Sequence, residues 1–242
     1  KDGQLDFIIA EGGWDNPPHG FNPSYKSHIF LSSPTGFKHQ AFGKKAKAHG
    51  ITIGDIDADA DLDFIISYIK DVAIYKNDGN GNFQVSSSLL PKHHTNFSEL
   101  VDVDMDGDLD LLLGTSGCKS KSKFWLNDGE GKFSTTNKII LTLGKPNIKL
   151  CLRHSGLMED WLNAEYKMIH HLIDFKNHIL LIVSNNHVGW GYRTLKKTDE
   201  GLEAVNDGKF LFGVNLNHFP YRILRKNKTD ITVYDFSFQP YK

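Results

Sequence analysis

Nine residues, Asp102 to Asp110, constrain this chain more than any others. They read Asp-Val-Asp-Met-Asp-Gly-Asp-Leu-Asp, so that a carboxylate occupies every odd position, and the apolar run 111–113 follows. Carboxylates packed this closely repel one another, which costs stability unless a counter-ion is present. Calcium takes about six to eight oxygen ligands, and a short loop with alternating acidic side chains can wrap one ion. Gly107, at position six, allows the sharp turn that such a loop needs.

The same pattern occurs 47 residues earlier, in Asp55 to Asp63, and the apolar run 64–66 follows it. We call these stretches the first acidic loop (Asp55–Asp63) and the second acidic loop (Asp102–Asp110). A lone stretch of this kind would suit a solvated turn equally well, but two copies, each entering a β-rich run, favour a metal site. Neither is an EF-hand, whose loop is longer and ends in Glu about twelve residues from its start.

A partial copy opens the chain. Asp2, Gly3 and Asp6 match positions five, six and nine of the acidic loop, and the first half of the pattern is missing. We expect calcium to be bound structurally, by side chains at positions one, three, five and nine and by the main-chain oxygen at position seven. The candidate metal residues are Asp55, Asp57, Asp59, Asp61, Asp63, Asp102, Asp104, Asp106, Asp108, Asp110, Asp2 and Asp6.

A second landmark follows each complete loop. The pattern Asn-Asp-Gly-x-Gly occurs at 77–81 and at 127–131, in each case between β-like runs, and a weaker equivalent lies at 31–37. Such a pattern is a strong hairpin signal, because its glycines supply the positive φ angles that tight turns need. One acidic loop with the hairpin that follows it makes one repeat unit. The sequence of each unit therefore predicts a strand, the acidic loop, a strand, a variable loop, a strand, a Gly-rich hairpin and a final strand.

Units of this kind predict an all-β fold, a β-propeller of four-stranded antiparallel blades of about 40–50 residues each. We expect a single domain, 1–242, with about five blades; part of a larger propeller is the alternative. Closing the ring would remove exposed sheet edges. Leu157–Leu172 is the exception, since its pattern suits a short helix inserted between blades and carrying Trp161. The expected blades are roughly 1–45, 46–95, 96–143, 144–205 and 206–242.

The acidic loop, its apolar strand and the Asn-Asp-Gly-x-Gly-x-Phe hairpin resemble the FG-GAP/VCBS repeat of integrin-α-type β-propellers. The resemblance is specific over 51–140, fair over 1–45 and weak over the last hundred residues. It implies a propeller with calcium in the loop that joins the first and second strands of a blade. It also implies a place among secreted, cell-surface or adhesion proteins that bind proteins or glycans, or among accessory modules of carbohydrate-active enzymes.

The C-terminal part departs from the pattern. Between 172 and 183 a short turn around Lys176 and Asn177 replaces the acidic loop, so no calcium is predicted there, and 196–202 is the corresponding hairpin. The last repeat can be aligned with the pattern in two ways. Residues 224–228 are a hairpin before a final strand from Ile231 to Phe238, or 231–237 aligns with 51–57 and supplies the strand that is missing before Lys1.

Composition excludes several classes. The chain has 242 residues, 39% of them hydrophobic, and a net charge of −1, which fits one large domain or two small ones and gives no electrostatic reason to expect nucleic-acid binding. No apolar run reaches about 18 residues, so no membrane span is predicted. No signal peptide is recognised, as in a mature or trimmed form. Cys118 and Cys151 either pair or are buried thiols.

Ligand-binding residues are expected in the loops between strands two and three, on the face opposite the calcium loops. Aromatic rings beside Asn, Asp and His suit sugars, since the ring packs on the pyranose and the polar groups take hydroxyls, while the lysines suit an anionic polymer. In the alternative reading, Trp14 and Trp190 are core residues that cap loops. The candidates are Trp14, Asp15, His19, Tyr25, Lys119, Lys121, Trp190, Tyr192 and Arg193.

Two classes of function remain. The first is a calcium-stabilised interaction module that binds a glycan or an extracellular protein, alone or in an assembly with other chains. The second is a polysaccharide-active lyase or hydrolase. A lyase would need a base such as His19 or His187 near Tyr25 or Tyr192. No catalytic motif is recognised, which favours the module. Extracellular calcium modules bind with dissociation constants of about 10⁻⁴–10⁻³ M, so we expect a secreted or cell-surface protein.

Overall fold

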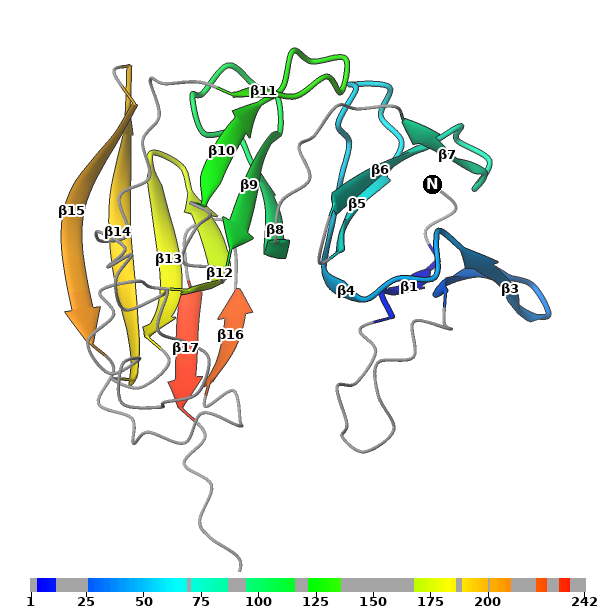
Figure 1. Ribbon diagram of the computed structural model, residues 1–242, viewed down its shortest axis with the longest axis horizontal. Coiled ribbons are helices and arrows are strands. Elements are labelled where there is room, and N and C mark those ends of the chain that lie inside the picture. The colour runs from blue at the N-terminus through cyan, green and yellow to red at the C-terminus, as the bar shows by residue number, and fades with distance from the viewer. Residues whose placement is uncertain are drawn as a thin grey trace, which may run out of the picture. The chain divides into compact units, whose positions relative to one another are not determined.

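The computed structural model describes the backbone of residues 4–11, 26–68, 71–86, 95–115, 122–135, 168–185, 189–199, 201–209, 221–225 and 231–235. These residues form strands and no helix, so the predicted all-β class is confirmed (Figure 1). The chain divides into two compact units, 1–141 and 142–242. In the described part of the chain, no helix is long and apolar enough to cross a membrane.

The described residues of the first unit form three antiparallel sheets, each a simple meander in chain order. The first sheet contains β1 (Phe7–Ile9), β2 (Ser27–Ser33) and β3 (Gly36–Phe42). The second contains β4 (Ala48–Gly54), β5 (Asp63–Tyr68), β6 (Asp71–Asn77) and β7 (Phe83–Ser86). The third contains β8 (Thr95–Val101), β9 (Asp110–Thr115), β10 (Lys123–Leu126) and β11 (Ser134–Thr135).

The core of this unit lies on both faces of the second sheet. Successive side chains of a strand point to opposite faces. On β5, Phe64 and Ile66 join a cluster with Ile29 of the first sheet, whereas Ile65 joins a cluster with Leu111 of the third. All of β5 is buried. Full burial on both faces is the reason that its sequence is a continuous apolar run rather than an alternating one.

The hairpins predicted in this unit are confirmed. Gly36 pairs with Ser33, Phe83 with Asn77, and Ser134 with Leu126. Phe124 and Trp125, expected in a core strand, are buried. The acidic loops connect β4 to β5 and β8 to β9, as expected.

Glu99 is a half-buried acid on β8, opposite Leu112 of β9. Burial raises the pKa of its carboxyl to about 7 from an ordinary value of 4.5. Between pH 4.5 and about 7, the folded state keeps a proton on Glu99 that the unfolded state has released. The contribution of Glu99 to stability is therefore full below pH 4.5 and is lost as pH rises through 7.

We expect the variant Glu99→Gln to be more stable than the wild type at pH 8, by about 2 kcal/mol, and to lose this advantage near pH 4.5. Urea unfolding at a series of pH values would measure it. Glu130→Gln, a change at an exposed hairpin position, is the control and should show no such trend. A constant difference between Glu99→Gln and wild type across this range would contradict the buried-acid interpretation.

The described residues of the second unit form one four-stranded sheet and one pair of strands. The sheet is formed by β12 (Met168–Phe175), β13 (His178–Asn185), β14 (Gly189–Thr198) and β15 (Gly201–Lys209). The pair is β16 (Tyr221–Arg225) and β17 (Ile231–Asp235). Ile169 and Leu172 on β12, Ile179 and Leu181 on β13, and Leu195 on β14 are buried, so β12, β13 and β14 all contribute to the core of this sheet.

Three expectations for this unit can be compared with the structure. The short turn at Lys176 and Asn177 and the hairpin from Thr198 to Gly201 are confirmed. The helix expected over Leu157–Leu172 is wrong at its C-terminal end, because β12 begins at Met168 and pairs along β13; cross-strand pairing outweighs the local helical pattern there. Trp161, Cys118 and Cys151 lie outside the described residues.

At the C-terminal end of the sequence, β17 pairs with β16, which agrees with the alternative that places a hairpin at 224–228 before a final strand. The pairing of 231–237 with the start of the chain stays a prediction. The closed ring also stays a prediction, because the strands that the structure describes pair within meanders of two to four strands.

Candidate metal centre

The second acidic loop is wound by hydrogen bonds from its own backbone to its carboxylates. The amide of Gly107 donates to Asp102 Oδ2 at 3.3 Å, and the amide of Asp108 donates to Asp106 Oδ1 at 3.0 Å. Gly107 has a φ of 101° and Met105 a φ of 66°. Because left-handed residues alternate with ordinary ones, the chain curls around one side of the loop rather than extending.

The first acidic loop has the same hydrogen bonds at the same positions. Ala60 N–H donates to Asp55 Oδ2 at 2.9 Å, and Asp61 N–H donates to Asp59 Oδ1 at 2.8 Å. Ala58 and Ala60 have φ angles of 59° and 68°. The shared pattern therefore dictates one backbone conformation in both loops, even where alanine stands in place of glycine.

Ala60 occupies the position that Gly107 has in the second loop, and alanine is strained at positive φ. We expect Ala60→Gly to stabilise the protein by about 0.5–1 kcal/mol, and Gly107→Ala to destabilise it by a similar amount. Nothing lies within 4 Å of a Cβ built at Gly107, so backbone strain alone is tested there. Thermal unfolding of both variants would measure the effect, and a shift of the same sign in both would refute this explanation.

Position nine of each loop is a buried aspartate that binds backbone amides. Asp63 accepts hydrogen bonds from Ile56 N–H at 3.1 Å and from Asn77 N–H at 2.8 Å. Asp110 does the same with Val103 N–H and Asn127 N–H, both at 2.9 Å. Each of these carboxylates therefore joins its loop to the following hairpin.

Burial affects the ionisation of both carboxylates at position nine. It raises the pKa of Asp63 and takes that of Asp110 to about 7, although the amide donors act in the opposite direction. A nearby cation would favour their ionised forms.

In the first sheet, the described residue that matches a loop aspartate is Asp6, at position nine. Asp6 Oδ1 accepts hydrogen bonds from the amide of Ser32 at 2.7 Å and from its hydroxyl at 3.0 Å. Ser32 precedes its hairpin as Asn77 precedes the next one. Asp2 lies outside the described residues, so the partial copy is seen only at this structural position.

The carboxylates at the start of each loop converge. One ligand atom from each of Asp55, Asp57 and Asp63 lies within 4.8 Å of the others, and the same holds for Asp102, Asp104 and Asp106. The remaining predicted metal residues with described positions, Asp59, Asp61, Asp108, Asp110 and Asp6, are not in these groups of described side chains. The structure therefore brings together positions one and three in both loops, with position nine in the first and position five in the second.

Several of these oxygens are buried without a hydrogen-bond partner. They are Oδ1 of Asp55, Oδ1 of Asp57 and Oδ1 of Asp104. Burial, and next the charges of Asp106 and Asp102, raise the pKa of Asp104. A buried polar atom that makes no hydrogen bond costs about 1–3 kcal/mol, and more if it is charged. Calcium, a hard cation, takes carboxylate oxygens as ligands, and oxygens that converge without a hydrogen-bond partner are free to bind it. The residues present therefore fit the ion.

No protein-family model matches the chain, and no curated protein matches it.

Lys76 and Asn127 join the first acidic loop to the third sheet. The ammonium of Lys76 on β6 lies 3.0 Å from Asp57 Oδ2 and donates to the carbonyl of Glu130 at 2.6 Å. The side-chain amide of Asn127 donates to the carbonyl of Ile56 at 2.8 Å. Sequence reasoning identified Asn127 only as part of a hairpin and missed Lys76. An alignment of the two repeats could have identified Lys76, because the residue before the first Asn of the hairpin is Lys76 in one repeat and Leu126 in the other.

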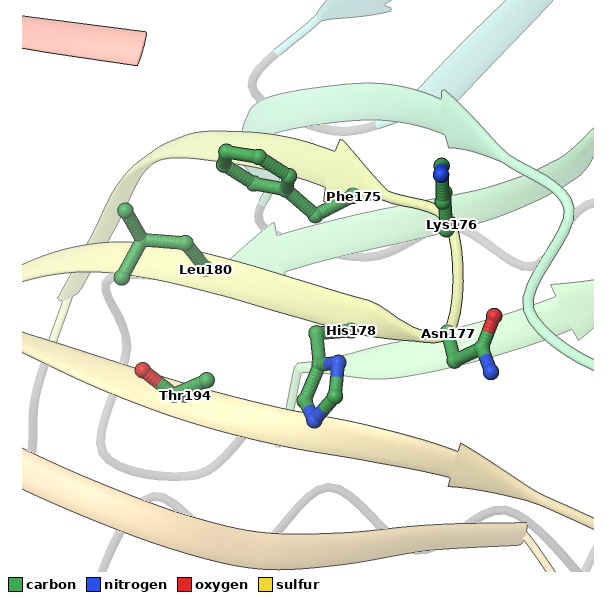
Figure 2. A pocket seen from close by; sticks show the side chains of 6 residues that line it. All are labelled: Phe175, Lys176, Asn177, His178, Leu180 and Thr194. Carbon is green, nitrogen blue, oxygen red and sulfur yellow. The ribbon is translucent and has the colours of Figure 1, made fainter. Parts of the chain in front are cut away.

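The fourth sheet, the one formed by β12–β15, has a different arrangement at its first turn. Lys197 is buried and its ammonium lies 2.8 Å from Asp174 Oδ1. Beside this turn is a depression of about 470 Å³, with Phe175, His178 and Thr194 among its lining residues (Figure 2). A lysine ammonium therefore provides positive charge for this aspartate.

The predicted ligand-binding residues are largely beyond the described positions. Trp14, Asp15, His19, Tyr25, Lys119 and Lys121 lie outside them. Trp190 and Tyr192 are described as backbone only, on β14, where they pair with Ser184 and Ile182 of β13. Arg193, opposite Leu181, is half-buried. A ligand face formed by these residues stays a prediction.

Proposed function

We propose that the protein is a calcium-stabilised β-propeller module of the FG-GAP/VCBS kind, which binds a glycan or an extracellular protein through the loops opposite the acidic loops. One observation carries the calcium part. In both acidic loops, carboxylate oxygens converge within 4.8 Å, and buried oxygens among them have no hydrogen-bond partner. Calcium would supply the missing partner and neutralise the charge.

The candidate ligands belong to Asp55, Asp57 and Asp63 in one loop and to Asp102, Asp104 and Asp106 in the other. The chemistry that calcium supplies there is charge neutralisation and oxygen coordination, so its role is structural. The chain itself holds the site: Asp63 and Asp110 fix each loop to its hairpin, and Ile56 and Val103 are buried beside the ligands. A rigid loop presents its oxygens together and so requires little ordering when an ion binds.

The partner part of the proposal is supported by the sequence alone, through the aromatic and basic residues of the variable loops. A glycan and extracellular-protein array, probed with calcium-loaded protein, would test it. We expect retained binding in wild type and loss in the double variant Trp14→Ala, Trp190→Ala. Release of unsaturated products from uronate polysaccharides at catalytic turnover would instead identify an enzyme, and no binding to any probe would refute the module.

Lys76 makes the two loops unequal. Its ammonium beside Asp57 competes with a bound cation, whereas Leu126 at the matching position in the third sheet does not. We expect Lys76→Leu to raise the calcium affinity of the first acidic loop by about tenfold, because about 1–2 kcal/mol of like-charge repulsion is removed.

Isothermal titration calorimetry would measure this change. Lys132→Leu is the control: Lys132 is exposed, pairs with Glu130 at 2.6 Å and should leave both affinities unchanged. Weaker binding in Lys76→Leu would mean that the lysine positions Asp57 for the ion rather than competing with it.

A further inference from the structure

Two histidines and a phenylalanine gather on one face of the first sheet. Phe30 on β2 lies directly opposite His39 on β3, and His28 is two residues before Phe30 on the same face. The sheet is the three-stranded one in Figure 1 that includes β1 and β3. None of these residues belongs to the acidic loops, so this cluster is separate from the candidate calcium sites.

The two imidazoles face each other through their nitrogens. His28 Nδ1 and His39 Nε2 are 2.8 Å apart, with ring centroids separated by 5.0 Å and ring planes inclined by 22°. Stacked rings stand about 3.5 Å apart or more, so nitrogens at 2.8 Å meet near the ring planes rather than face to face. One nitrogen must donate and the other must accept, so at least one presents a lone pair toward its neighbour.

Phe30 holds this pair in place. Its ring lies against His39, with centroids 4.7 Å apart and an inclination of 24°. The two strands are paired without a register shift from Ser27 opposite Phe42 to Ser33 opposite Gly36, so the backbones that carry both histidines are fixed as well. A ligand pair whose rings are held before binding loses little freedom when an ion binds.

We propose that His28 and His39 form a binding site for a late first-row transition metal ion, Zn²⁺ in the first instance. Imidazole nitrogen is the ligand that Zn²⁺, Cu²⁺ and Ni²⁺ take, whereas calcium takes oxygen. With Zn–N bonds of about 2.0–2.1 Å, two ligands of a tetrahedral ion stand roughly 3.3 Å apart. The observed 2.8 Å is about half an ångström shorter, so on binding the rings separate slightly and turn until both nitrogen lone pairs meet at the ion, and the shared proton is released to water. Water completes the coordination at this surface position.

The site would tie β2 to β3 across the first sheet. An ion that binds only the folded state stabilises it in proportion to the logarithm of its concentration over its dissociation constant. Because the ligands differ in kind from those of the acidic loops, this proposal does not depend on the proposed calcium sites.

Titration of the whole chain with ZnCl₂, in buffer with saturating CaCl₂, tests the proposal. Calorimetry and imidazole ¹⁵N NMR compare wild type with His28→Ala, His39→Ala and the double variant. His178→Ala, on β13 in the other unit, is the matched control. We expect each single variant to lose about tenfold or more in affinity for one Zn²⁺, with the control unchanged. Cu²⁺ should bind the wild type more tightly than Zn²⁺ does.

Unchanged zinc affinity in the double variant, shown by circular dichroism to be folded, would overturn the proposal. So would NMR shifts that leave the His28 and His39 resonances in place while other histidines move. His39→Asn, which keeps a polar group at the exposed position, provides a second folded variant if an alanine variant misfolds, and it should lose zinc binding to the same extent.

Discussion

Adding about 10 mM CaCl₂ to ion-free protein is expected to raise its melting temperature by about 10 °C. A ligand that binds only the folded state contributes RT ln(1 + [L]/Kd), which is about 1.4–2.7 kcal/mol per site for a Kd of about 10⁻³–10⁻⁴ M. Two sites thus contribute about 3–5 kcal/mol, and 1 kcal/mol shifts the melting temperature of a domain of this size by about 2–4 °C. Differential scanning calorimetry with and without a chelator measures the effect.

Two controls make this result specific. The same concentration of MgCl₂ should stabilise less, because Mg²⁺ demands near-ideal octahedral geometry and keeps its waters. The variant Asp57→Asn, Asp104→Asn removes one charge from each group while preserving side-chain size, and it should lose most of the calcium-dependent shift. Equal melting temperatures with calcium and with chelator, in protein shown by metal analysis to start ion-free, would defeat the calcium proposal.

Much of the fold was predictable because its determinants are local. Glycines at the hairpins and apolar runs after the acidic loops place strand ends within a few residues, and the pairings of Phe83 with Asn77 and of Ser134 with Leu126 agree. The exception is β12, where cross-strand partners override a helical pattern. A pattern in one segment carries no information on the strand that will pair with it.

The candidate site was predictable as a stretch but not as a division of roles. The sequence predicts side-chain ligands at positions one, three, five and nine alike. In the structure, Asp63 converges with Asp55 and Asp57 and also accepts backbone amides, whereas Asp110 accepts backbone amides and is not in the group of Asp102, Asp104 and Asp106. Those amides include Asn77 and Asn127, which are 14 and 17 residues further along the chain. The pair His28 and His39 escaped notice for the same reason, since only the register of β2 and β3 brings them together.

Position two of each loop fixes the ligands through the core, and this predicts a second large effect. Ile56 stands between Asp55 and Asp57, is 1% exposed, and packs in one cluster with Ile65, Leu111 and Trp125. We expect Ile56→Ala to lower the free energy of unfolding by about 3 kcal/mol, because it removes buried methyl groups and leaves a cavity that the two flanking sheets can fill only in part.

Ile53→Ala is the matched control, because Ile53 lies three residues earlier on β4 and is 51% exposed. It should change stability by less than about 0.5 kcal/mol. Urea unfolding of both variants compares their stabilities, and calorimetry compares calcium binding. Since Ile56 holds the backbone between two candidate ligands, its loss should weaken calcium binding at the first acidic loop and leave the second unchanged. Equal weakening at both loops would mean that the sheet as a whole, rather than this anchor, sets the geometry of the carboxylates.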